Sequence, residues 1–216
     1  MDIYYSGHSS FRLKGKTATV VTDPFDSKMV GLKYPLTEAN IVTISHDHED
    51  HNNADIIKGD PKIISGPGEY EIKEVTILGF PSYHDTKKGE ERGKNTIYVF
   101  EIDGIRICHL GDLGEKLSET LIEALGEIDV LLIPVGGTYT IDSREAAELV
   151  REIEPSFVLP MHFFVDGMNK ASFEKLEPAE PFLREVGLTV EKMPKLSIKK
   201  EEIDTEVQKV IILERK

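Results

Sequence analysis

The sequence predicts a mixed α and β (α+β) protein with a sandwich core. The first half of the chain contains short β-branched or apolar runs separated by turn residues, and the second half alternates apolar runs with amphipathic helical patterns. A meander followed by strand–helix alternation requires two sheets covered by helices. At 216 residues the chain has the size of one sizeable domain, which we expect to span residues 1–216.

Short strands dominate the predicted first half. The expected strands are 2–6, 9–13, 17–22, 40–44, 62–65, 75–80, 95–102 and 105–110. Tight turns join several of them, and Asp103-Gly104 is a strong hairpin signal. Loops are expected at 25–38, at Gly66-Pro67-Gly68 and at 87–94, and residues 54–58 suit a short helix.

Helices enter in the second half. The spacing of apolar residues predicts helices over 118–125, capped by Ser118, and over 142–153, capped by Asp142 or Ser143. A third helical segment, 170–186, should be broken by Pro178 and Pro181, because proline lacks the backbone donor of a helix interior. The expected strands of this half are 129–134, 157–161, 189–193 and 207–213.

The composition bounds the function. With 39% hydrophobic and 30% charged residues the chain fits a globular protein, and neither a signal peptide nor a membrane-spanning apolar run is visible, so we expect a cytoplasmic protein without a membrane partner. The net charge of −13 repels polyphosphate and therefore favours a small-molecule substrate over nucleic acid. A homo-oligomer is compatible with the sequence, and the abundant Lys and Glu favour a heat-adapted source.

A dense group of histidines and carboxylates follows the strand predicted at 40–44. It has the sequence Ser45-His46-Asp47-His48-Glu49-Asp50-His51-Asn52. Imidazole and carboxylate together suit Zn, Mn or Fe. Alternate residues of an extended chain point the same way, so His46 and His48 can aim at one ion, while Asp50 and His51 can turn toward a second ion.

Three further polar residues also stand where predicted strands end. They are His84, Asp112 and His162. Taken singly, His84 could be a surface residue, Asp112 a turn former and His162 a core histidine. Four strand ends that meet at one rim would instead deliver enough ligands for two ions, and a carboxylate suits the bridging position because its two oxygens can reach both.

Other residues near strand edges have less definite roles. Asp23 could accept a hydrogen bond from a metal-binding imidazole, whereas for His8 a structural and a functional role are both open. His109 and Cys108 lie within a strand-like run and are expected in the core. The motifs of zincins, serine hydrolases, P-loop proteins and dithiol oxidoreductases are absent from the sequence.

The motif His46-x-His48-x-Asp50-His51, followed in order by His84, Asp112 and His162, resembles that of the metallo-β-lactamase superfamily. Within that superfamily, Gly7-His8-Ser9-Ser10-Phe11, Thr22-Asp23-Pro24 and the segment from Pro134 to Thr140 are similar to the branch of ascorbate-6-phosphate lactonase-like hydrolases. The resemblance spans roughly residues 1–165.

The resemblance implies a four-layer αββα sandwich of two mixed sheets flanked by helices. It also implies two divalent metal ions, with zinc as the first expectation and Mn or Fe as alternatives. One ion would take His46, His48 and His84, and the other Asp50, His51 and His162. Asp112 would bridge them, Asp50 and Asp112 would be the catalytic carboxylates, and a bridging hydroxide would be the nucleophile.

Three functions are therefore weighed. The first is a metal-dependent hydrolase of a small anionic metabolite that contains a lactone, an ester or a phosphoester. The second is a ribonuclease Z-like phosphodiesterase, which the charge of −13 disfavours. The third is a metal-binding sensor without turnover, in which protein ligands would close the site. Arg144 and Lys170 are the first candidates for a basic subsite, and segments 87–94 and 170–186 are expected to shape the pocket.

Overall fold

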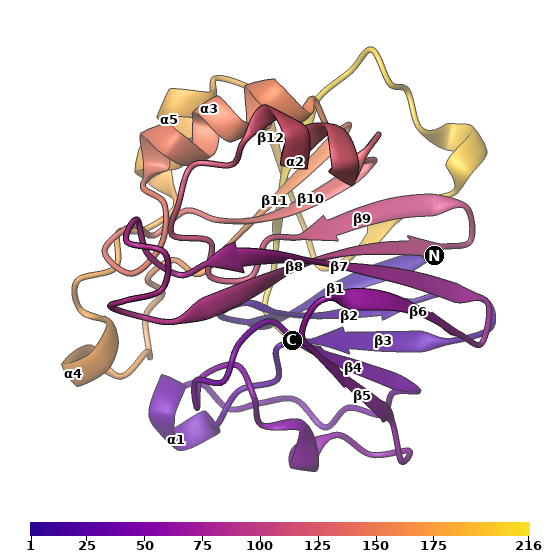
Figure 1. Ribbon diagram of the computed structural model, residues 1–216, viewed down its shortest axis with the longest axis horizontal. Helices are drawn as coiled ribbons and strands as arrows, with labels where there is room; N and C mark the ends of the chain where they lie inside the picture. The colour runs from indigo at the N-terminus through magenta and orange to yellow at the C-terminus, as the bar shows by residue number, and fades with distance from the viewer.

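The computed structural model describes residues 1–216, and its strands form two sheets packed face to face (Figure 1). In spatial order the six-stranded sheet consists of β13 (Leu196–Ser197), β1 (Asp2–Gly7), β2 (Ser10–Lys14), β3 (Thr19–Thr22), β4 (Ile41–Ile44) and β5 (Lys62–Ser65). The eight-stranded sheet consists of β12 (Thr189–Met193), β14 (Lys209–Leu213), β11 (Phe157–Met161), β10 (Val130–Pro134), β9 (Ile105–His109), β8 (Lys94–Ile102), β7 (Val75–Tyr83) and β6 (Gly68–Ile72).

Both sheets are mixed. In the smaller sheet β1, β2 and β3 pair antiparallel, whereas β3, β4 and β5 pair parallel. In the larger sheet the segment from β6 to β9 is an antiparallel meander, and the segment from β9 through β10, β11 and β14 to β12 is parallel. Parallel strands need crossover connections, and this is where the helices of the second half are placed.

Helices cover the outer faces of the two sheets. The larger sheet is covered by α2 (Glu119–Leu125), α3 (Ser143–Ile153) and α5 (Glu180–Val186), as Figure 1 shows. The smaller sheet carries α1 (Ser27–Val30), α4 (Lys170–Phe173) and the 3₁₀ turn η1 (Ala54–Ile56), and a second 3₁₀ turn, η2 (Lys200–Glu202), lies near the C-terminus. The predicted α+β sandwich is therefore confirmed.

Three apolar clusters hold these layers together. The largest contains 23 buried residues contributed by the inner faces of both sheets. A second cluster, of 21 residues, lies between the larger sheet and its helices, and a third, of 13 residues, lies under α1 and α4. Burial of apolar surface on both faces of each sheet is the main stabilising contribution in such a fold.

The second-half helices begin where the sequence predicts. Ser118 accepts a hydrogen bond from the backbone of Leu121 at the start of α2. Asp142 and Glu145 form a reciprocal capping box at the start of α3. Pro178 separates α4 from α5 as expected, but Pro181 lies in the first turn of α5 instead of breaking it, because the first turn of a helix has no partner for that backbone N–H.

Two strands of the larger sheet differ from those expected. Strand β6 was not predicted, because it begins within the turn expected at Gly66-Pro67-Gly68 and has only two apolar residues, Tyr70 and Ile72, which are half-buried against the cluster between the sheets. Strand β7 continues through Pro81 to Tyr83 instead of ending at Phe80. Proline is tolerated there because β6 pairs with β7 only as far as Gly79, so that Pro81 lies on a free edge.

Two short elements also escaped prediction. Helix α1 lies within the predicted loop 25–38, where Asp26 caps it and Gly31 ends it in the left-handed conformation. Strand β13 has two residues, which is too short for a periodic signal. No helix combines the length and the apolar character that crossing a membrane would require.

Tyr98 connects the two sheets close to the candidate site. It is fully buried in the cluster between the sheets. Its hydroxyl accepts a hydrogen bond from the backbone N–H of Gly66 (2.9 Å) and donates to the carbonyl of Ile44 (3.1 Å). Ile44 is the last residue of β4, so this contact fixes the point where the histidine-rich segment begins.

Replacement of Tyr98 by Phe is expected to destabilise the fold. The substitution leaves the Gly66 N–H and the Ile44 carbonyl without their partner, which costs about 1–3 kcal/mol of unfolding free energy. Urea unfolding followed by circular dichroism measures the loss. Tyr70→Phe is the matched control, because the Tyr70 hydroxyl also bonds Gly66, donating to its carbonyl at 3.3 Å, but from a more exposed position. Equal unfolding midpoints for both variants would contradict this role of Tyr98.

Candidate metal centre

The polar residues singled out in the sequence lie at strand ends of both sheets. They are His8 after β1, Asp23 after β3, His46, His48, Asp50 and His51 after β4, His84 after β7, Asp112 beyond β9 and His162 after β11. Because the two sheets pack face to face, these loops meet at one edge of the sandwich. The structure brings all nine side chains into one connected cluster.

The cluster contains three overlapping groups of potential ligand atoms, and the third of them, Asp23 with His46 and His51, shares its histidines with the other two. In the first, one nitrogen from each of His46, His48 and His84 lies within 4.8 Å of the others. The second group consists of His8, Asp50, His51 and His162, with ligand atoms within the same 4.8 Å. The division matches the one that the family resemblance implies, with His8 added to the second group.

Asp112 lies between the first and the second of these groups. Its Oδ2 is 3.3 Å from Nε2 of His84 and 3.9 Å from Nε2 of His46 in the first group. The same oxygen is 3.2 Å from Nε2 of His51 and 3.0 Å from Nε2 of His162 in the second. One buried carboxylate oxygen therefore faces four imidazole nitrogens.

Several of these atoms have no hydrogen-bond partner although they are buried. Nε2 of His46, Nε2 of His51 and Oδ1 of Asp112 are the clearest examples. Buried polar atoms are nearly always hydrogen-bonded, so a group of unpartnered nitrogen and oxygen atoms in one region indicates a site suited to a cation. The donor set of imidazole and carboxylate fits Zn, Mn or Fe, and the residues present therefore fit a metal centre.

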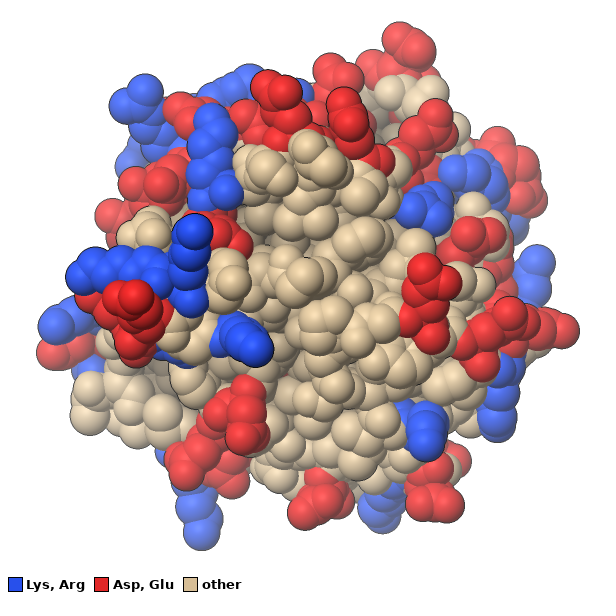
Figure 2. All heavy atoms as spheres, in the orientation of Figure 1, with Lys and Arg blue, Asp and Glu red and all other residues tan.

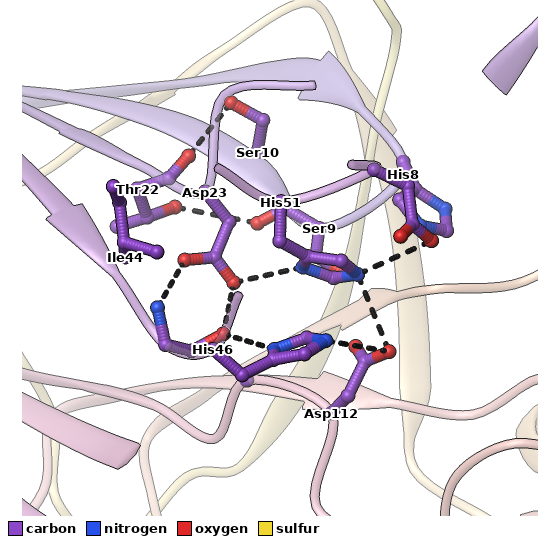
Figure 3. Close-up of polar contacts among 12 residues, drawn as sticks. His8, Ser9, Ser10, Thr22, Asp23, Ile44, His46, His51 and Asp112 are labelled. Carbon is purple, nitrogen blue, oxygen red and sulfur yellow. Dashed lines mark hydrogen bonds and ion pairs between the residues drawn. The ribbon is translucent and has the colours of Figure 1, made fainter. Parts of the chain in front are cut away.

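Asp23 and Ser45 hold two of the histidines in position (Figure 3). One oxygen of Asp23 accepts hydrogen bonds from Nδ1 of His51 (3.0 Å) and from the Ser45 hydroxyl (2.5 Å). The other oxygen accepts the backbone N–H of Ser45 at 2.8 Å. Because Ser45 donates to Asp23, its oxygen is left to accept Nδ1–H of His46 at 2.9 Å. Both imidazoles are thereby fixed with Nε2 directed at Asp112.

His8 contacts the second group. Its Nε2 lies 3.0 Å from Oδ2 of Asp50, and its side chain is buried. The backbone carbonyl of His8 accepts hydrogen bonds from the N–H of His162 (2.9 Å) and the hydroxyl of Tyr5 (2.9 Å). His8 thus contacts one candidate ligand with its side chain and a second with its backbone.

Three of these residues adopt a backbone conformation that side chains rarely take. The φ angles of His8, Asp23 and His162 are +54°, +39° and +50°. Such left-handed residues cost of order 1–3 kcal/mol each and persist where the surrounding structure fixes them. Here they turn the chain sharply at the ends of three strands, so that the side chains point into the cluster.

The electrostatics of the cluster are consistent with cation binding. Burial alone would raise the pKa of Asp112, but the nearby His162 and His51 outweigh burial and hold the pKa well below its usual value. Burial lowers the pKa of His46 well below 6.5, which keeps a neutral imidazole with a free lone pair. For His51 burial is outweighed by Asp112 and Asp50, which raise its pKa well above 6.5. The carboxylates therefore create a place for positive charge at this position.

Two glycines allow the loops to approach closely. A side chain at Gly114 would collide with the backbone of His84, and one at Gly136 would collide with the carbonyl of His162. Gly136 thereby lets the loop after β10 pack directly against His162, the residue that follows β11.

Sequence reasoning missed two supporting residues. Ser45 belongs to the motif, and it relays the hydrogen bond from His46 to Asp23, a role that the motif alone does not indicate. Asn95 accepts the backbone N–H of Asp112 (3.0 Å) and donates to the Leu110 carbonyl (2.8 Å), so it fixes the loop that carries Asp112. No local pattern distinguishes Asn95 from a strand-edge residue, because its partners come from another strand end.

The two residues expected in the core are found there. His109 is completely buried, its Nε2 bonds the carbonyl of Ser9 (2.8 Å), and its Nδ1 accepts the N–H of Gly111 (3.2 Å). Neither nitrogen is free for a metal. Cys108 is also fully buried, and burial raises the pKa of its thiol far above the ordinary value, which makes it unreactive.

A cleft of about 320 Å³ opens onto the cluster. Its floor contains His48, Asp50, His84, Asp112 and His162. The walls include Met29, Tyr139 and Phe173 on the apolar side and Arg92 on the polar side. The segments 87–94 and 170–186 thus both contribute to the cleft, but Arg144 and Lys170 do not line it, and Arg144 pairs with Glu148 on the surface of α3.

Comparison with known proteins identifies the class. The family model described as "Beta-lactamase superfamily domain" matches residues 2–162, three quarters of the chain. A Thermotoga maritima structure described as a candidate zinc-dependent hydrolase of the metallo-β-lactamase superfamily aligns with a TM-score of 0.82 and 36% identity over 100% of this chain and 99% of the other. The chain is a metal-dependent hydrolase of the metallo-β-lactamase superfamily, with the metallo-β-lactamase fold.

Curated relatives specify the family more narrowly. A Thermococcus onnurineus protein named "UPF0173 metal-dependent hydrolase" is 30% identical over 188 residues, which cover 74% of this chain and 84% of the relative. A Pyrococcus furiosus protein of the same family name is 29% identical over 189 residues, with the same coverage. This chain accordingly belongs to the UPF0173 metal-dependent hydrolase family. These relatives do not carry the name of the lactonase-like branch that the sequence suggested.

Loss of the Asp23 carboxylate is expected to weaken metal binding. Asp23→Ala removes the acceptor that orients both His51 and, through Ser45, His46, and loss of such an outer partner typically lowers metal affinity about 10–100-fold. Competition with a chromophoric zinc chelator measures the affinity. Asp47→Asn is the control, because Asp47 lies in the same motif but is exposed and bonds only Asn52. Equal affinities for the Asp23→Ala variant and the wild type would contradict the orienting role.

Proposed function

We propose that this protein hydrolyses a small anionic metabolite containing a lactone, an ester or a phosphoester at a site for two divalent metal ions. The observation that carries the proposal is the pair of ligand groups that meet at Asp112 on the floor of an open cleft. In this proposal one ion is held by His46, His48 and His84 and the other by Asp50, His51 and His162. Asp112 is shared between them.

Two bound divalent ions would supply Lewis-acid polarisation of the scissile bond and a shared bridging hydroxide of lowered pKa as the nucleophile. The role of the protein is to hold the candidate ligand side chains in fixed orientations. Asp112 supplies the central negative charge, and Asp23 and Ser45 fix the two imidazoles that face it. His8 holds Asp50 in one orientation through its 3.0 Å contact. Hydrolysis adds one water across the bond, so an ester or lactone yields a carboxylate and an alcohol.

The open cleft supports catalysis over a sensor role. A structural metal site is normally closed by four protein ligands, whereas a catalytic site keeps a position for water or substrate. Here the floor of the cleft includes members of both ligand groups, among them His48, which is exposed. A substrate that enters the cleft would reach the candidate ligands directly.

The surface supports a small substrate over nucleic acid. Figure 2 shows a face on which Lys and Arg are interspersed with Asp and Glu around the rim, without a basic stripe. The whole chain carries a net charge of −13. A phosphodiesterase acting on RNA would need a basic track along which the RNA backbone could bind.

Zinc is the first candidate for the metal, because imidazole and carboxylate are the side chains that commonly bind zinc in proteins. Mn and Fe are the alternatives.

Removal of metal is expected to abolish hydrolysis. Dialysis against a chelator should leave a folded apoprotein without activity toward a panel of aryl esters, lactones and aryl phosphoesters. Addition of Zn or Mn should restore activity, and the metal-to-protein ratio at full activity, measured by plasma emission spectrometry, is expected to be two. Activity that survives in the apoprotein would refute metal catalysis, and saturation at one ion would refute the dinuclear site.

Substitution of the candidate carboxylates is expected to remove activity without unfolding the chain. Asp50→Ala and Asp112→Asn each delete a negatively charged ligand, so the loss of turnover should exceed the roughly 100-fold upper range for an outer-shell partner. Steady-state hydrolysis of the best panel substrate measures the effect, and circular dichroism verifies the fold. Asp47→Asn serves as the control within the same motif. Unchanged hydrolysis of every panel substrate by Asp50→Ala would defeat the proposal.

A further inference from the structure

Arg92 is the basic side chain of the cleft. Among the residues that line the cleft it is the one lysine or arginine, although the chain contains 26 of these residues in total. The guanidinium takes part in no ion pair, and the adjacent Glu91 is bound instead to Lys87 at 2.6 Å. A guanidinium without a carboxylate partner keeps its planar donor fork free for a ligand.

The guanidinium of Arg92 lies against an aromatic ring that is itself held in place. It lies over the ring of Tyr139, with 5.5 Å between the Arg92 Cζ and the ring centroid. The hydroxyl of Tyr139 in turn donates to the carbonyl of Ser172 at 2.9 Å. Arg92 therefore spans the cleft between its own loop and the opposite wall, where Tyr139 and Phe173 provide apolar surface.

The backbone of Arg92 is tied to the metal-binding segment. Asp85, the residue directly after His84, is buried and accepts four backbone N–H groups, from Lys87 (2.8 Å), Gly89 (2.9 Å), Glu91 (3.0 Å) and Arg92 (2.7 Å). Burial acts to raise the pKa of Asp85, but these donors, led by Arg92, outweigh it and lower the pKa to about 2. The loop is thus wound around a carboxylate that adjoins a candidate ligand.

A second hollow lies on the other side of Arg92. This hollow has a volume of about 420 Å³. Its lining contains polar residues such as Ser65, Thr96 and Lys94, two glycines and one proline, and no large hydrophobic side chain. His48 and Arg92 line both hollows. A molecule whose scissile bond lies beside His48 would therefore meet an apolar wall on one side, a polar hollow on the other, and Arg92 between them.

From this arrangement we infer that Arg92 binds an oxyanion of the substrate, a carboxylate or a phosphate group located close to the bond that is cleaved. The inference rests on the proposed hydrolase function and specifies its substrate: an amphiphilic anion whose apolar portion packs against Met29, Tyr139 and Phe173. A protein with a net charge of −13 repels anions on average, so a single unpaired guanidinium beside the site is the feature that would select them.

The test compares matched neutral and anionic ligands on the metal-loaded protein. The esters are 4-nitrophenyl butyrate and 4-nitrophenyl hemisuccinate, which have acyl chains of equal length. Arg92→Gln is expected to lower kcat/KM for the hemisuccinate about 10–100-fold more than for the butyrate, the range for losing a charge-assisted contact. Arg92→Lys should retain part of the preference. Arg144→Gln is the control, because Arg144 is an exposed arginine of α3. This substitution should leave kcat/KM unchanged for both esters.

Binding without turnover separates this inference from the hydrolase proposal. The first ligand is N-(4-nitrophenyl)succinamic acid, in which an amide replaces the ester, and the second is an analogue of it that ends in a phosphonate. Calorimetry measures the binding of each ligand to the wild type and to the Arg92→Gln variant. Weaker binding to the variant supports the inference, and the tighter of the two ligands identifies carboxylate or phosphate as the preferred group. Equal binding to both proteins overturns the inference even if esters are cleaved. Selective binding without hydrolysis of any ester, lactone or phosphoester would support Arg92 as the anion site and refute the proposed function.

Discussion

A buried carboxylate oxygen surrounded by four imidazole nitrogens is the interaction on which the arrangement of the strand ends depends. Asp112 cannot be buried alone, since an unpaired charge in the interior costs several kcal/mol. The histidines that face it come from the ends of β4, β7 and β11, and Asp112 itself follows β9. Strands of both sheets must therefore end at the same level for these imidazoles to reach the Asp112 carboxylate.

The sandwich could be predicted because its signals are local. The β-branched runs, the Asp103-Gly104 hairpin and the capping box of α3 each act within a few residues, so their positions in the structure agree with those expected. The features that could not be predicted depend instead on contacts between segments. Strand β6 exists because β7 offers it an edge, and Pro81 is tolerated because β6 stops at Gly79, so both depend on a neighbour that the local sequence does not specify.

The candidate site shows the same division. His46, His48, Asp50 and His51 are conspicuous in the sequence because they are adjacent, whereas His84, Asp112 and His162 needed the resemblance to a known family before they could be assigned to either group. Ser45, Asn95 and Arg92 were not recognised, because their partners are brought near by the fold alone. The expectation that Arg144 or Lys170 supplies the basic subsite was wrong, since closeness in sequence to Thr140 and His162 does not direct a side chain into the cleft.

The loop wound around Asp85 has a consequence for how such an enzyme could change its specificity. Its neck is closed by the hydrogen bond from the His84 N–H to the Gly93 carbonyl (3.1 Å), while the residues between are largely exposed. Insertions or exchanges within that exposed arc can alter the rim of the cleft without displacing His84, because the neck and the Asp85 carboxylate anchor both ends. Selection could therefore diversify substrate choice in this loop while the metal chemistry stays the same.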